Sequence, residues 1–140
     1  MEKTVIKSES ANPSDLLPST AKGWGSYTPL HEEDRNLTIL VTLTKGNRMR
    51  YHSHKGRREI WIVASGIGAA VLNENSRNVK EGDVIEISAG IRHTIIAETD
   101  LKIIEVQIGD VSAEDKKIYD LRLDYFNDGS TSYSYSVHRD

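Results

Sequence analysis

The sequence predicts an all-β protein, a single domain of double-stranded antiparallel β structure. Segments of strand length recur about every ten residues between residues 37 and 108, with turn residues between them, which is typical of β-sandwiches and small barrels. The chain has 140 residues, which is room for one domain of ordinary size, since domains usually hold about 100–200 residues. We therefore expect no separate catalytic module.

The first predicted strand covers residues 37–43. Its apolar residues alternate, so that Leu37, Ile39, Val41 and Leu43 share one face, and its β-branched residues pack well on a pleated surface. Turn chemistry follows at residues 45–47. The same signals predict further strands at Arg48–His54, Glu59–Ala64, Gly68–Leu72, Val84–Ile87, Arg92–Ala97 and Leu101–Ile108.

The two ends of the chain differ from this block. Residues 1–22 are predicted to form an irregular N-terminal leader, residues 23–125 the barrel domain, and residues 126–140 a polar tail that is either irregular or an added edge strand. The segment from Ser112 to Asp115 has the character of a helix cap, so we expect a short helical turn over residues 113–120 near the C-terminus.

Charge and composition exclude several classes of function. A net charge of −3 is unlike that of a nucleic-acid-binding protein, so nucleic acid is not an expected partner. The chain has no cysteine, so any metal must be held by His, Asp or Glu. No apolar stretch has the length of a signal peptide or a membrane span, and we expect a cytoplasmic protein without membrane association.

Three of the five histidines form a spaced pattern with one acid. His52 and His54 are two residues apart on a predicted strand, so both point to the same face. A tight connection brings Glu59 to the start of the neighbouring strand, and a strand and turn bounded by glycines return His93 to the same region. Three imidazoles and a carboxylate suit a divalent Mn, Fe, Co, Ni or Zn ion and leave positions open for water or substrate.

The two sequence blocks that hold these residues resemble the two signature motifs of the cupin superfamily. The motif residues are, in order, Gly46, His52, His54, Glu59 and Gly66, followed by Gly82, Gly90 and His93. The resemblance implies a jelly-roll barrel, the cupin double-stranded β-helix, with a metal bound near its centre by His52, His54, Glu59 and His93.

Flanking segments narrow the resemblance further. Residues 24–27, 59–61, 104–109 and 114–115 resemble the cupin domain of type II phosphomannose isomerases, over roughly residues 23–125. That resemblance implies a mannose-6-phosphate isomerase, which interconverts an aldose and a ketose. In that family the domain is often fused behind a sugar nucleotidyltransferase, and three consecutive histidines commonly stand where this chain has His52-Ser53-His54.

Strand alternation suggests what surrounds the metal. If His52 faces inward, Arg50 and Arg48 do too, and their guanidinium groups indicate an anionic ligand; alternatively Arg48, at the strand end, reaches water. Trp61 faces inward by the same argument. Glu105 and Gln107 share a face of the last strand, which either lines the barrel or faces solvent; the pattern alone does not decide.

The leading functional hypothesis is a metal-dependent isomerase acting on a small molecule, a phosphorylated sugar. Glu105 is the candidate general base and Arg50 the group that holds phosphate or polarises a hydroxyl, with Arg48, Arg50, Trp61 and Gln107 as the predicted substrate-binding residues. An Fe(II)-dependent cupin dioxygenase and a non-catalytic sugar- or metabolite-binding cupin are the alternatives.

An apolar stripe is expected on the outside of the barrel. Ile60 and Ile62 alternate with the inward residues of their strand and so face outward. Such a stripe is usually covered, either by the protein's own N-terminal segment or by a second subunit, and on this basis we predict a homodimer.

Overall fold

The computed structural model describes residues 20–127 and 133–138, and none of these residues lies in a helix. The all-β prediction is confirmed. Most of the predicted N-terminal leader lies outside the described residues, but its last three residues form a strand, and described parts of the predicted tail form a hairpin. No part of the described chain is a helix long and apolar enough to span a membrane.

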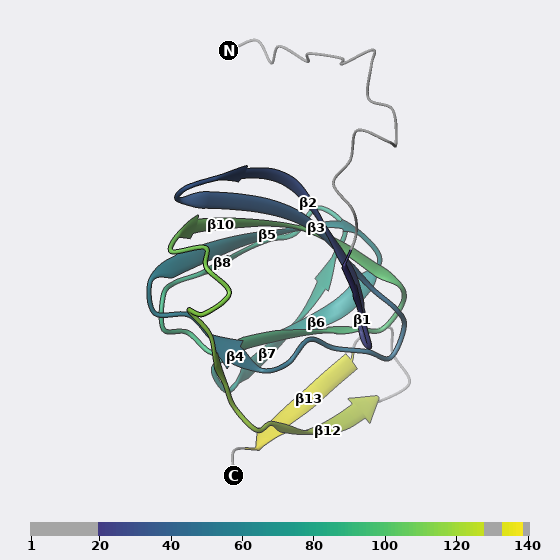
Figure 1. Cartoon of the computed structure of the whole chain (residues 1–140). Coiled ribbons are helices and arrows are strands. Elements are labelled where there is room, and N and C mark those ends of the chain that lie inside the picture. The colour runs from purple at the N-terminus through teal and green to yellow at the C-terminus, as the bar shows by residue number, and fades with distance from the viewer. Residues whose placement is uncertain (1–19, 128–132, 139–140) are drawn as a thin grey trace, which may run out of the picture.

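Two antiparallel sheets make up the body of the protein and face each other (Figure 1). The first sheet has, in spatial order, β1 (Thr20–Lys22), β2 (Gly25–Glu33), β3 (Asn36–Leu43), β10 (Leu101–Gly109), β5 (Arg57–Ser65) and β8 (Val84–Ile87). The second has β11 (Lys117–Ile118), β4 (His52–Ser53), β9 (His93–Ala97), β6 (Ile67–Leu72) and β7 (Asn75–Lys80), and the hairpin consists of β12 (Arg122–Asn127) and β13 (Tyr133–His138).

The core lies between the two sheets because the central strands alternate buried and outward-facing residues. On β10, Leu101 and Ile103 are fully buried while Lys102 is exposed, and on β5 the same alternation buries Trp61 and Val63. These apolar residues fill one end of the interior. The inward positions that continue along β5 and β10 toward the other end are polar, so the alternation that builds the core also directs polar side chains into the barrel.

Two predicted elements are wrong. The strand expected over Arg48–His54 is regular only at β4, with an isolated bridge between Arg48 and Ile96. The helical turn expected over residues 113–120 is a non-helical turn at 113–115 followed by β11, which pairs with β4. The Asp115 side chain caps amides of another loop instead of its own backbone, so nothing local extends that turn into a helix.

Two motif glycines with left-handed backbone allow a sharp test of the fold. At Gly66, between β5 and β6, φ is +94° and a Cβ would lie 2.2 Å from the Asp100 carbonyl oxygen. At Gly46 φ is +85°, but a Cβ would meet nothing within 4 Å. We expect Gly46→Ala to lower the free energy of unfolding by about 1 kcal/mol, and Gly66→Ala by about 2–4 kcal/mol because a backbone clash adds to the strain. Urea denaturation measures both, and equal losses would contradict this packing.

Candidate functional site

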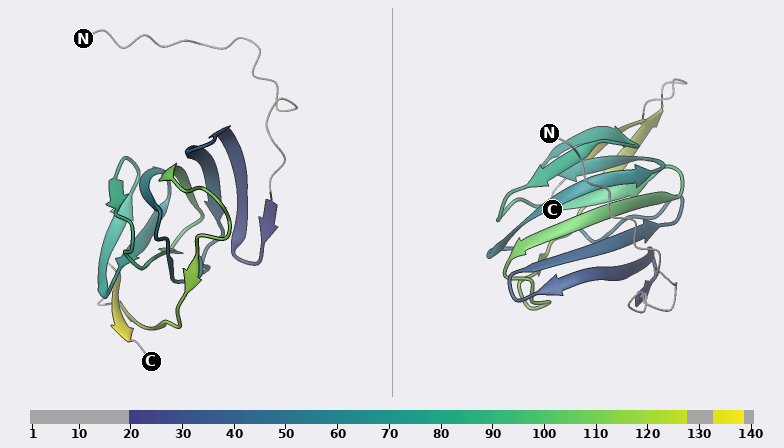
Figure 2. Two further views of the ribbon diagram at one scale, coloured as in Figure 1. Left: turned by 60° about the vertical axis from the view of Figure 1, so that its left-hand side comes forward. Right: turned by 90° about the horizontal axis from the view of Figure 1, so that it is seen from above.

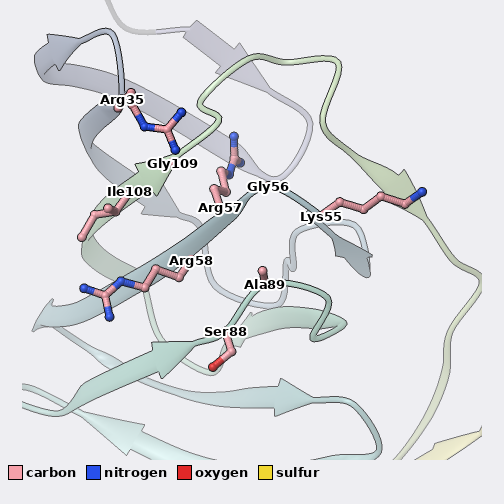
Figure 3. A pocket seen from close by; sticks show the side chains of 9 residues that line it. All are labelled: Arg35, Lys55, Gly56, Arg57, Arg58, Ser88, Ala89, Ile108 and Gly109. Atoms are coloured by element: carbon pink, nitrogen blue, oxygen red, sulfur yellow. The ribbon is translucent and has the colours of Figure 1, made fainter.

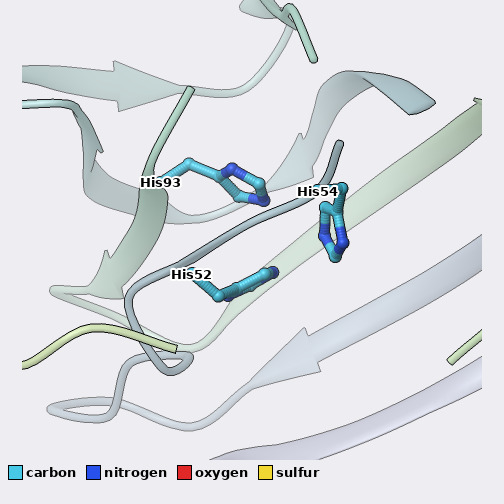
Figure 4. Close-up of side chains that lie close together, drawn as sticks. All are labelled: His52, His54 and His93. Atoms are coloured by element: carbon cyan, nitrogen blue, oxygen red, sulfur yellow. The ribbon is translucent and has the colours of Figure 1, made fainter. Parts of the chain in front are cut away.

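Three histidine rings converge between the sheets (Figure 4). His52 on β4 pairs directly with His93 on β9, so the two side chains project from the second sheet side by side. His54 follows two residues after His52 and joins them. One nitrogen from each ring lies within 4.8 Å of the others, and all three residues are buried.

Backbone carbonyls fix the tautomers of these rings. The Nδ1 atom of His93 donates to the Ile91 carbonyl at 2.9 Å, and those of His52 and His54 donate to the carbonyls of Arg50 and Asp115. The proton therefore sits on Nδ1, and each Nε2 keeps its lone pair, as a metal ligand requires. Burial lowers the pKa of His52 to about 3 and also lowers that of His54, so both rings are neutral at pH 7.

Glu59, on β5 of the opposite sheet, completes the cluster. Its two carboxylate oxygens lie 3.3 Å from the Nε2 atoms of His54 and His93. Burial would raise the pKa of Glu59, but the Arg57 guanidinium, which donates to Oε2, opposes burial, and the pKa is held below its usual range. The carboxylate is therefore charged.

The cluster fits a divalent ion. Ligand atoms about 2.1 Å from one ion and at right angles to each other lie roughly 3 Å apart, close to the 3.3 Å between Glu59 and the rings of His54 and His93. Glu59 Oε1 and His93 Nε2 are also buried without a hydrogen-bond partner among the described residues. Orphaned buried polar atoms are costly, and a shared cation would satisfy both.

Asp115 supports this cluster from outside. Its carboxylate accepts hydrogen bonds from the amides of Lys55 and Gly56, both at 2.8 Å, which hold the pKa of Asp115 below its usual range. Its carbonyl accepts the Nδ1 proton of His54. We expect Asp115→Ala to loosen this segment and lower the affinity for divalent metal by about 10-fold. Calorimetric titration measures the affinity; Glu114→Ala, at the exposed neighbouring residue, is the control, and equal affinities in the two variants would contradict the supporting role.

A cavity of about 710 Å³ opens beside the histidines, a volume suited to a small ligand. Its polar lining residues include His52, His54, Arg50, Arg57, Glu105 and Gln107, and its apolar lining residues include Trp24, Tyr27, Leu37, Ile39, Val41 and Met49. The cavity therefore combines charged and hydrogen-bonding groups with apolar surface, and on the first sheet the two kinds are neighbours, since Glu105 pairs with Ile39 and Gln107 with Leu37.

Glu105 and Gln107 lie on the inward face of β10. Of the two alternatives that the sequence left open, the face therefore lines the barrel and does not face solvent. Glu105 accepts hydrogen bonds from Trp61 Nε1 at 2.8 Å and Gln107 Nε2 at 2.7 Å. Burial, and then the nearby charge of Glu59, raises the pKa of Glu105 to about 7, although these hydrogen bonds oppose the rise. Glu105 is thus a carboxyl group able to take up or release a proton near neutral pH.

The family follows from comparison with known sequences. A sequence model of the family described as "Mannose-6-phosphate isomerase C-terminal" matches residues 14–122. The chain belongs to this family.

A mannose-1-phosphate guanylyltransferase of Salmonella muenchen is 32% identical over 94 residues, which cover 66% of this chain and 20% of the relative. The xanthan biosynthesis protein XanB of Xanthomonas campestris is 27% identical over 112 residues, covering 79% and 24%. The chain thus spans only a fifth to a quarter of these relatives.

Solved structures establish the fold of this family member. The nucleoside dehydratase Pac13 of Streptomyces superimposes with a TM-score of 0.67 at 13% identity, over 74% of this chain and 85% of that protein. Oxalate decarboxylase of Bacillus subtilis gives a TM-score of 0.66 at 18% identity, over 75% and 30%. The predicted cupin fold, a jelly-roll barrel or double-stranded β-helix, is confirmed.

Of the remaining predicted site residues, the structure brings one to the cavity and leaves two outside its lining. Arg50 lines the cavity. Arg48 does not reach it and donates to the Leu121 carbonyl at 3.1 Å, because the broken strand ends the alternation that was to turn it inward. Trp61 is fully buried behind Glu105, with its ring centroid 5.5 Å from that of His93, so it positions these groups instead of lining the cavity.

Arg57 is a site residue that the sequence reasoning missed. Its side chain is 9% exposed, lines the cavity, and donates to Glu59 Oε2 and to His54 Nε2. The sequence placed it in the tight connection that precedes the predicted strand Glu59–Ala64, outside the candidate site. The available signal was alternation, because residue 57 lies two positions before Glu59 and therefore shares its face once β5 begins at Arg57.

Proposed function

We propose that the protein is a metal-dependent isomerase of phosphorylated sugars that interconverts mannose 6-phosphate and fructose 6-phosphate. The observation that carries the proposal is the position of Glu105, a buried carboxyl group with a pKa near 7 in the wall of the cavity that the three histidines also line or border. The family description and the relatives named for mannose 1-phosphate support a sugar-phosphate ligand.

His52, His54, Glu59 and His93 are the proposed metal ligands. Imidazole nitrogens and one carboxylate suit divalent Zn, Mn, Fe, Co or Ni. When bound, such an ion supplies a Lewis acid that stabilises negative charge developing on a sugar oxygen.

The chain's own groups supply the proton transfer. Glu105, as its carboxylate, removes the proton from C2 of the aldose, and the resulting carboxylic acid returns a proton to C1, while the hydroxyl proton moves from the C2 oxygen to the C1 oxygen. Atoms and electrons balance without an oxidant. Gln107 Oε1, a buried acceptor with no partner among the described residues, accepts a sugar hydroxyl, and Arg50 binds the phosphate.

The experiment is turnover in deuterated water. Protein loaded separately with Zn(II), Mn(II) or Co(II) is incubated with mannose 6-phosphate under anaerobic conditions and followed by NMR. We expect fructose 6-phosphate carrying solvent deuterium at C1, and no product from metal-stripped protein. Absence of turnover with every hexose phosphate tried would overturn the proposal.

Two other outcomes would point to a different function. Oxygen consumption with Fe(II) would indicate a dioxygenase. Thermal stabilisation by a sugar phosphate that is recovered unchanged would indicate a binding protein without catalysis.

We also propose that the protein is a homodimer, joined through the outer face of the first sheet (Figure 2). Pairing places Ile62 beside both Val84 and Ile104, and Ile60 beside Val106, which makes a continuous apolar surface. Ile62 is 39% exposed and Val84 55%. A contiguous apolar face of this kind typically meets a partner.

Ile62→Lys tests the interface, since it places a charge in the middle of this face. We expect a dimer in the unmodified protein and a monomer in the variant, measured by analytical ultracentrifugation. Ile67→Lys, at an isoleucine 43% exposed on the second sheet, is the matched control and should remain dimeric. A monomeric unmodified protein, or a variant that still dimerises, would contradict the interface.

A further inference from the structure

Arg57 occupies two of the groups that the metal would use. Its Nη2 atom donates to His54 Nε2 at 2.9 Å and lies 3.0 Å from Glu59 Oε2, and its Nε atom donates to the same oxygen at 3.0 Å. The neighbouring Arg58 is exposed, and the two side chains leave β5 in different directions (Figure 3). Of these two arginines, Arg57 is therefore the one that places its charge against His54 and Glu59.

An ion and the Arg57 guanidinium cannot both use His54. A neutral imidazole has one lone pair available at its unprotonated nitrogen, and the Nδ1 proton of His54 is held by the Asp115 carbonyl, so this lone pair is at Nε2. A metal at Nε2 must displace Nη2 of Arg57. The carboxylate of Glu59 has several lone pairs, so the bond from Arg57 Nε to Glu59 can remain when Nη2 is released.

We propose that Arg57 competes with the metal for His54 and Glu59, and that metal binding frees its guanidinium to bind the anionic group of the substrate. The inference rests on the metal site of the proposed function. Once released, Nη2 is a largely buried donor beside a dication that has taken much of the charge of Glu59. Arg57 and Arg50 line the same cavity, so an anion that enters it satisfies both guanidinium groups.

Thermodynamic linkage makes the coupling measurable in both directions. If the metal must free Arg57 before an anion can bind well, then metal raises the affinity for the anion and the anion raises the affinity for metal by the same factor. A purely structural Arg57 predicts the opposite change in metal affinity, because the loss of its side chain would then weaken metal binding.

The first test is calorimetric titration of the metal-stripped full chain with Co(II). We expect Arg57→Met to bind Co(II) about 10- to 100-fold more tightly than the unmodified protein, because a hydrogen bond to a charged group no longer opposes the ion. Arg57→Lys, which keeps the charge but not the forked geometry, should fall between them, and Arg58→Met should match the unmodified protein. Equal or weaker binding by Arg57→Met would overturn the inference.

The second test uses mannitol 1-phosphate, which has a phosphate but no carbonyl group and so cannot be isomerised. We expect its affinity for the unmodified protein to rise at least 10-fold when Co(II) is present, and Arg57→Met to lose most of this rise. Metal and anion coupling without any isomerase activity would uphold the inference and overturn the proposed reaction. Turnover together with unchanged Co(II) affinity in Arg57→Met would uphold the proposed reaction and overturn the inference about Arg57.

Discussion

Replacing His93 by alanine is expected to lower the affinity for divalent cobalt or zinc more than about 100-fold, beyond the usual loss for a residue that only supports a ligand. His93 is 1% exposed, and its Nε2 atom faces Glu59 without a hydrogen-bond partner in the described part of the chain. Removing the ring leaves His52 without its partner across the β4–β9 pair and Glu59 Oε1 without the nitrogen that faces it, so the ion loses one of its four proposed ligands.

Metal affinity is measured by calorimetric titration, with elemental analysis for stoichiometry and circular dichroism to show that the variant is folded. His31→Ala is the matched control, because His31 is an exposed histidine on β2 that bonds to Glu33, outside the cluster. Zinc should raise the melting temperature of the control and not that of the His93 variant. Stoichiometric uptake at unchanged affinity by His93→Ala would contradict the metal centre.

The central strands were predictable because burial on one face leaves a period of two in the sequence. β8 agrees with its predicted bounds, and β3, β5 and β10 begin or end within two residues of theirs. β7 was missed because it lies at an edge of its sheet and Val79 is its only buried residue, so it has no apolar pattern. β2 was missed although it lies between β1 and β3, because four of its nine residues are exposed and none is buried, so it too has no apolar pattern.

It was harder to predict which polar side chains face the interior of the barrel. On β10 the usual rule would turn the apolar residues Ile104 and Val106 inward, but they face outward, and Glu105 and Gln107 face the cavity. A polar cavity inside and an apolar surface outside reverse the common pattern, and a single sequence holds no signal for that reversal. For Arg48 the alternative prediction holds: the residue is exposed and does not line the cavity, because alternation applies only along a continuous strand.

Glu105→Gln is expected to lower kcat for the proposed isomerisation by about 10²- to 10⁴-fold, the usual contribution of a general base. The substitution keeps an acceptor for Trp61 Nε1, and the Gln107 amide can rotate to accept from the new amide, so the cavity wall keeps its shape. Glu86→Gln on β8 makes the same change at an exposed residue outside the cavity and should retain full activity.

The pH dependence separates a base from a residue that only shapes the cavity. A general base must be ionised, so kcat/KM should fall as the pH drops below the pKa of Glu105, about 7 in the metal-free protein and lower beside a bound cation.

In the metal-free protein the raised pKa of Glu105 means that the native state holds the proton more tightly than the unfolded chain. The unmodified protein should therefore lose stability relative to Glu105→Gln as the pH rises from about 4.5 to 7, by up to roughly 3 kcal/mol. Urea denaturation at several pH values measures this difference. A difference that stays flat across that range would show that the pKa of Glu105 is not raised in the native state, and full activity in the variant would remove Glu105 from the reaction.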